Sequence, residues 1–230
     1  MNLLAIETST EFLSLAACRG EVFFTQDVEA GQRHSELMLG SIFALLSRAE
    51  LGIADLEGIA YGEGPGSFTG LRIACGVAQG FAYARGLKVI GVSTLLALAE
   101  QAAVDKVYAC IDARMGEVYH AAYCRRSSGD GMGGEQWQAV HAPGLCRPQD
   151  VPVPEGGAWV GLGSGFAAHR DLLCGRLGGA LERVEPDVFP SAAAVLRLAS
   201  PRFARGEGGV PESAIPIYIR DKVALKKSER

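Results

Sequence analysis

The sequence predicts an α/β fold made of two similar lobes, and three observations lead to this fold class. Short apolar runs typical of strands alternate with longer runs of helical spacing. Residues 1–104 give the order βββαβαβα. Residues 105–230 repeat the beginning of this order in a shortened form. A pattern that occurs twice indicates two related lobes of βββαβα type, with a boundary near residues 104 and 105.

The first lobe begins with a predicted three-stranded meander. An apolar run at 3–6 is followed by a polar turn at 7–11, and an alternating strand pattern then covers 13–17. A third strand at 22–26 completes the meander. From residue 35 the spacing becomes helical, with Met38, Ile42, Leu45 and Ala49 on one apolar face. Strands at 58–61 and 88–92 and helices at 69–85 and 93–103 are expected to complete the lobe.

The stretch 59–85 joins a strand end, a glycine-rich loop and a helix that Ser67 or Thr69 can cap. Ile73, Val77 and Phe81 recur every fourth residue and form a stripe of large apolar side chains. A second face of the helix carries almost no side chains. It consists of Gly70, Ala74, Ala78 and Ala82, flanked by Gly76, Gly80 and Ala84.

Gly76 and Gly80 together oppose this helix by about 2 kcal/mol, since a glycine inside a helix costs roughly 1 kcal/mol relative to alanine. Close contact with other atoms would offset this cost, because backbones can approach where Cβ atoms are absent. Two interpretations stay open: the helix packs against its own sheet, or it packs against a helix of another subunit. A third interpretation is that a phosphate binds at the helix N-terminus. It is less supported, because no lysine follows in the P-loop position.

The second lobe is expected to contain strands at 106–111, 117–124, 136–141 and 159–161. Helices are expected near 166–173 and 191–204, and an extended segment at 215–219. The sequence leaves open whether the last helix returns to the first lobe.

Composition narrows the class of protein. The chain is 48% hydrophobic, yet no apolar run approaches the roughly 20 residues that span a bilayer, and the N-terminus lacks the pattern of a signal peptide. We therefore expect a cytoplasmic protein that does not bind membranes. The six cysteines show no CxxC spacing, and the four histidines include no pair spaced four residues apart. We expect neither disulfides nor a metal site.

The net charge of −4 argues against a chain that binds nucleic acid unaided. The C-terminal tail is the exception, because five basic residues fall within the last eleven. Such a tail can contact an RNA backbone held by another subunit, or it can simply be a solvated terminus. The basic residues are Arg220, Lys222, Lys226, Lys227 and Arg230.

Two turns are candidates for a nucleotide site in the cleft between the lobes, by analogy with other two-lobed folds of this topology. Hydroxyl groups of Thr8 and Ser9 can hold a phosphate, and Asp112 can hold magnesium. The structural alternative is that both are ordinary hairpin turns. A third candidate is the glycine cluster at 161–165, which precedes a predicted helix. No Ser/His/Asp set and no catalytic carboxylate pair can be assembled from spacing.

Several strings in the chain resemble the TsaB family, formerly called YeaZ. The resemblance covers essentially the whole chain, and its most specific strings are GPGSFTGLR and DARMGEVY. These strings occupy residues 64–72 and 112–119, and they are supported by LAIETST at 4–10 and GVSTL at 91–95. The family belongs to the actin-like ATPase (ASKHA) superfamily, whose lobes are RNase H-like, and this agrees with the duplicated pattern.

The resemblance implies a non-catalytic scaffold subunit. Its catalytic paralogue TsaD, together with the ATPase TsaE, transfers a threonylcarbamoyl group to the adenosine next to the anticodon of certain tRNAs. The two helices at 35–49 and 69–85 are then the surface for TsaD or for a homodimer, and tRNA is met only through the complex. The residues expected to bind the partner are Met38, Ile42, Leu45, Gly70, Leu71, Ala74, Ala78, Gly80 and Ala82.

The resemblance also implies that this chain contributes no catalytic residue and requires no cofactor. The catalytic paralogue binds its metal through a helical HxxxH pair, whereas the region at 33–38 here retains only His34. Where actin-like ATPases usually have Asp in the first phosphate turn, this chain has Glu7. Binding of ATP or ADP with magnesium is left open. The rival hypotheses are a free-standing ATPase, phosphotransferase or peptidase-like hydrolase of the same superfamily, and a tRNA-binding module.

Overall fold

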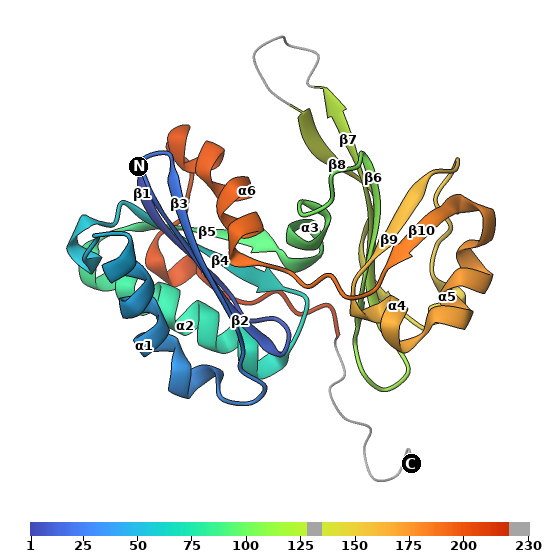
Figure 1. The fold of residues 1–230 in the computed structure, drawn as a ribbon, viewed down its shortest axis with the longest axis horizontal. Helices are drawn as coiled ribbons and strands as arrows, with labels where there is room; N and C mark the ends of the chain where they lie inside the picture. Colours follow the sequence, from blue (N-terminus) through green and yellow to red (C-terminus); the bar gives the residue numbers. More distant parts are fainter. Residues whose placement is uncertain (128–134, 221–230) are drawn as a thin grey trace.

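The computed structural model describes residues 1–127 and 135–220, and it contains two five-stranded sheets that lie side by side (Figure 1). The first sheet has the order β3-β2-β1-β4-β5, and the second has the order β10-β9-β6-β7-β8. In each sheet an antiparallel meander is extended by two parallel strands. The predicted two-lobed α/β fold is therefore confirmed.

The first sheet places its two most apolar strands near its centre. Strand β1 is buried from its second residue onward, and it pairs antiparallel with β2 and parallel with β4. Strand β3 is the edge and alternates exposed with half-buried residues, as expected for a strand with one face in water. The strands are β1 (Asn2–Glu7), β2 (Phe12–Arg19), β3 (Val22–Glu29), β4 (Gly58–Gly64) and β5 (Lys88–Ser93).

Helices cover both faces of the first sheet (Figure 1). Helices α1 (His34–Arg48) and α2 (Phe68–Arg85) cover one face and share an apolar core with it. Helix α6 (Ala192–Ala204) covers the other face, where Leu196 and Phe203 pack against residues of β1, β4 and β5. The C-terminal helix thus returns to the first lobe. A division of the chain at residues 104 and 105 separates the two sheets correctly but assigns α6 to the wrong lobe.

The second sheet carries its helices at the far side of the molecule. Strands β6 (Lys106–Asp112), β7 (Val118–Ser127) and β8 (Glu135–Cys146) form the meander, and β9 (Trp159–Leu162) and β10 (Leu181–Glu185) extend it. Two short helices, α4 (Ser164–Ala168) and α5 (Arg170–Leu177), occupy the place where a single helix at 166–173 was predicted. Strand β10 was missed, because its residues are mostly polar and only partly buried.

Helix α3 (Thr94–Ala99) links the lobes and ends earlier than predicted. Its apolar residues Leu95 and Leu98 pack against the second sheet. Glu100, at its end, accepts hydrogen bonds from Trp137 of β8 at 2.7 Å and from Arg197 of α6 at 3.3 Å. One carboxylate therefore connects both lobes.

No helix in the described part of the chain is both long and apolar enough to cross a membrane. The six cysteines are free thiols, four of them buried.

The second sheet contains a buried histidine whose protonation opposes folding. His120 of β7 is 6% exposed, and burial together with the nearby His141 lowers its pKa from 6.5 to about 4. Because folding favours the neutral ring, the stability that His120 contributes is complete above pH 6.5. It is lost as the pH falls toward 4.

We therefore expect the free energy of unfolding to fall by roughly 2–3 kcal/mol between pH 7.5 and pH 4.5 through this residue. The measurement is urea unfolding of the native chain and of His120→Gln at both pH values. The variant should show a smaller loss on acidification, and equal losses in the two proteins would contradict the assignment.

Candidate functional site: an outward helix face and a cleft between the lobes

An apolar surface lies on the outward side of α1 and α2. Leu39 and Phe43 of α1 are 50% and 52% exposed, and Tyr83 of α2 is 75% exposed. Gly76 and Gly80 of α2 open onto the same side, and a Cβ atom added at either would meet no other atom within 4 Å. We call these five residues the α1/α2 face.

Most of the residues predicted to bind a partner lie beneath this face, which corrects the assignment. Ala74, Ala78 and Ala82 of α2 face the chain's own sheet, because small side chains let the helix axis approach β1 and β4 closely. The first interpretation, packing against the sheet, thus holds for this row. Of the nine predicted residues only Gly80 is exposed, and the buried ones are Met38, Ile42, Leu45, Gly70, Leu71, Ala74, Ala78 and Ala82.

The glycines on the outward side have no packing role within the described chain. Gly70 has one, because a Cβ there would overlap the carbonyl oxygen of Thr8. Gly76 and Gly80 face open space instead, so each weakens the helix by roughly 1 kcal/mol without a compensating contact in the chain. Their absent side chains leave room for the backbone or side chains of a second molecule.

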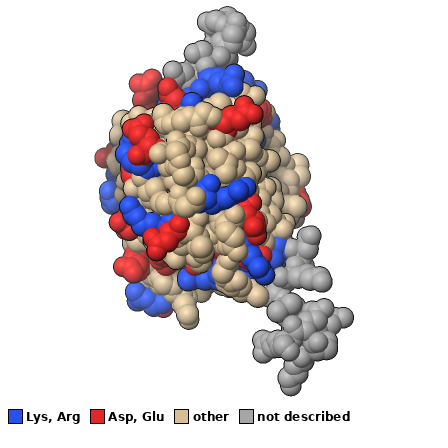
Figure 2. All heavy atoms as spheres, turned by 90° about the vertical axis from the view of Figure 1, so that its right-hand side faces the viewer, with Lys and Arg blue, Asp and Glu red and all other residues tan. Residues whose placement is uncertain are grey.

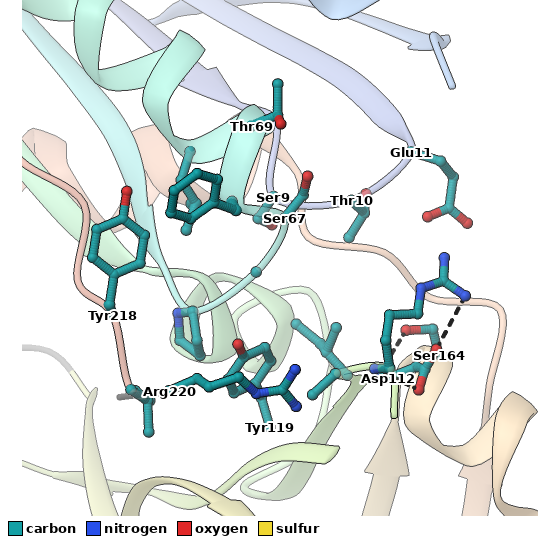
Figure 3. Close-up of a pocket in the computed structure, with 18 of the residues that line it drawn as sticks. Ser9, Thr10, Glu11, Ser67, Thr69, Asp112, Tyr119, Ser164, Tyr218 and Arg220 are labelled. Carbon is teal, nitrogen blue, oxygen red and sulfur yellow. Dashed lines mark hydrogen bonds and ion pairs between the residues drawn. The ribbon is translucent and has the colours of Figure 1, made fainter. Parts of the chain in front are cut away.

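A cleft of about 770 Å³ lies between the lobes (Figure 3). The turn after β1, the start of α2, the turn after β6 and the start of α4 meet there. The C-terminal segment 214–220 passes along it and reaches the second lobe, where Arg220 donates a 2.6 Å hydrogen bond to Glu117. Polar and charged lining residues include Ser9, Thr10, Glu11, Ser67, Thr69, Asp112, Arg114, Ser164 and Arg220.

The structure brings Ser9 and Asp112 to this cleft but not Thr8. Thr8 is fully buried, and its hydroxyl donates to the carbonyl oxygen of Gly70 at 2.8 Å. The backbone N–H of Ser67 donates to the carbonyl oxygen of Ser9 at 2.7 Å, so the loop before α2 lies flush on the turn. Ser9 is 3% exposed, and its hydroxyl has no partner within the described residues.

The Asp112 carboxylate is already held by the protein. Its Oδ1 accepts from the backbone N–H of Arg114 at 3.1 Å and lies 3.4 Å from Nε2 of His169. Its Oδ2 lies 3.3 Å from the Arg114 guanidinium. The Ser164 hydroxyl, in the glycine cluster at 161–165, accepts from the Asp112 N–H, and Gly165 packs on β6. This cluster is explained by packing.

The acidic residue of the first turn is buried as well. Glu7 is 2% exposed, its Oε1 accepts from the Ser9 N–H at 2.6 Å, and its Oε2 has no partner within the described residues. Burial raises the pKa of this carboxyl. Glu7 lies under the turn and Asp112 is engaged by Arg114 and His169, so these residues do not fit a magnesium–nucleotide complex.

Comparisons with known proteins agree with this architecture. A family model described as TsaD, tRNA N6-adenosine threonylcarbamoyltransferase, matches residues 20–224. The "tRNA threonylcarbamoyladenosine biosynthesis protein TsaB" of Escherichia coli (strain K12) is 37% identical, with 99% of this chain and 98% of that protein covered. The chain belongs to the TsaB family. The protein of the same name in Haemophilus influenzae is 33% identical over 99% of this chain and 97% of its own length.

A solved structure, "YeaZ from Pseudomonas aeruginosa", has the same fold. It superposes with a TM-score of 0.84 at 33% identity, covering 94% of this chain and 99% of that one. TsaB-family membership and the actin-like, RNase H-like fold class are thus confirmed.

Other candidate residues have internal roles. His34 is buried, and its Nε2 lies 3.1 Å from the carbonyl oxygen of Phe12. Within residues 1–127 and 135–220, no three His, Cys, Asp or Glu side chains are grouped to hold a metal. Arg220 of the predicted basic tail pairs with Glu117, while Lys222, Lys226, Lys227 and Arg230 lie outside the described residues.

Sequence reasoning missed Leu39, Phe43 and Tyr83. Leu39 and Phe43 are spaced by four residues on α1, and each follows directly after a residue of the buried stripe of Met38, Ile42 and Leu45. They therefore form a row beside that stripe, about 100° round the helix. This second apolar row was the signal from which the exposed surface could have been predicted. A helix that covers one face of a sheet needs only one apolar row for that contact.

Replacing Gly76 or Gly80 by alanine should stabilise the isolated chain by roughly 0.5–1 kcal/mol at each position, because the added methyl group meets open space and alanine favours helix. Chemical unfolding of each variant measures this. Destabilisation by either would show that the glycine is needed inside the monomer.

Glu7→Gln should raise the stability at pH 7, since the amide oxygen keeps the hydrogen bond from Ser9 and no charge is buried. A carboxyl with a raised folded pKa supports folding below its unfolded value of 4.5 and opposes it as the pH rises. The stability gain should therefore shrink toward pH 4. A variant that is equally or less stable than the native chain at pH 7 would contradict a desolvated Glu7.

Proposed function

We propose that this chain is the scaffold subunit that docks a TsaD-type catalytic paralogue during formation of threonylcarbamoyladenosine in tRNA. One observation carries the proposal. The α1/α2 face combines two glycines in the middle of a helix that cost stability with exposed Leu39, Phe43 and Tyr83. A protein that functions alone gains nothing from this combination, whereas a helical partner can pack closely on it.

The names of the relatives indicate the pathway, since proteins similar over nearly their whole length are named for tRNA threonylcarbamoyladenosine biosynthesis. The cleft supplies a second line of support. Glu7, Thr8 and Asp112 are each buried or held by neighbouring groups, so the chemistry falls to the partner. TsaE and tRNA then join through the complex, and the same face serves self-association when the partner is absent.

Gly80→Leu should weaken docking of the TsaD of the same organism by at least tenfold, because the side chain fills the space that the partner needs. Isothermal titration calorimetry measures the Kd. Gly175→Leu is the matched control: Gly175 also lies within a helix, α5, and a Cβ there also meets nothing within 4 Å.

The control should bind as the native chain does, and both variants should keep native circular dichroism. Native affinity of Gly80→Leu would refute docking at this face. ATP or peptide hydrolysis by the isolated chain would favour the rival enzyme hypothesis.

A further inference from the structure

A cavity of about 450 Å³ opens beside the α1/α2 face, between α2 and the C-terminal segment. Its two walls come from parts of the chain more than 120 residues apart in sequence. One wall is the outward side of α2, and the other is the short 3-10 helix η4 (Pro211–Ser213). The lining residues are Gly76, Gln79, Gly80, Tyr83, Pro211 and Glu212.

The second wall is a fixed part of the fold. The side-chain amide of Gln79 donates to the carbonyl oxygen of Ala214 at 2.9 Å, and Ala214 is 1% exposed in the core of the first lobe. Just before η4, Gly209 exchanges backbone hydrogen bonds with Val89 of β5. The cavity is therefore preformed, which lowers the entropy that a partner loses on entering it.

Charge identifies what the cavity accepts. Glu212 stands exposed at its rim and forms no ion pair within residues 1–127 and 135–220. The other lining residues are uncharged. The basic residues of α2 are engaged elsewhere: Arg72 donates to the Tyr218 hydroxyl and Arg85 to the carbonyl oxygen of Ala54.

The shape narrows the occupant further. Gly76 and Gly80 form a floor without side chains, and the Tyr83 ring and Pro211 provide apolar walls. A long aliphatic stem can lie along such a floor and bring a cationic group to Glu212. Arginine and lysine are the side chains with this combination of stem and charge.

We propose that this cavity is a socket for one arginine or lysine side chain of the TsaD-type partner, with Glu212 as its ion-pair acceptor. This inference rests on the proposed docking function and extends the contact surface from α1 and α2 to the C-terminal segment. Tyr83 is 75% exposed and Glu212 is exposed in the free chain, so water leaves the pair only when the partner covers it. Covered in this way, the ion pair is stronger than one left at the rim of an interface.

The test measures Kd for the TsaD of the same organism at 50 and 300 mM salt. Glu212→Lys should weaken binding at least tenfold at low salt, because like charges then meet. Glu212→Gln should weaken it about threefold to tenfold and reduce its dependence on salt. Asp171→Lys on α5 of the second lobe makes the same charge change away from the face and should bind as the native chain does.

The outcomes separate this inference from the function on which it rests. If Gly80→Leu abolishes docking while Glu212→Lys binds with native affinity, the socket is wrong and the docking face stands. If neither change alters the Kd, both fail. If Glu212→Lys impairs only self-association, measured by sedimentation in an analytical ultracentrifuge, then the occupant is a second copy of this chain and the assignment to TsaD is overturned.

Discussion

Close packing of α2 on the first sheet is the constraint on which the rest of the structure depends. Gly70 lies against the carbonyl oxygen of Thr8, and the alanine row at 74, 78 and 82 is fully buried over the sheet. Because one side of the helix is occupied in this way, its opposite side, with Gly76 and Gly80, must face outward. The same contact holds the loop before α2 against the turn at 8–10, where the Ser67 N–H donates to the carbonyl oxygen of Ser9.

Two features of the chain lower its own stability, and both lie near this helix. Glycines in mid-helix weaken α2, and Glu7 is desolvated beneath the turn. Natural proteins retain such costs mainly where function requires them. For the glycines, the function that fits is contact with another molecule. No such function is assigned to Glu7, whose carboxylate accepts a hydrogen bond from the Ser9 N–H. Its burial therefore lowers the stability of the fold without an assigned benefit.

The C-terminal segment connects features that are distant in sequence. It borders the socket at Glu212, passes the start of α2 where Tyr218 meets Arg72, and reaches the second lobe where Arg220 meets Glu117. This extended segment therefore contacts the α1/α2 face, the cleft and the second lobe.

The sequence by itself determined the two-lobed fold, most element positions and the family, because hydrophobic periodicity and the GPGSFTGLR and DARMGEVY strings are local signals. It also determined that α2 has a bare side. Only the tertiary structure decided which side is outward: a helix apolar almost all round gives no local sign of which stripe meets the sheet. Likewise α6, Glu212 and the engaged Asp112 depend on contacts between segments that are far apart in the sequence, which no local pattern encodes.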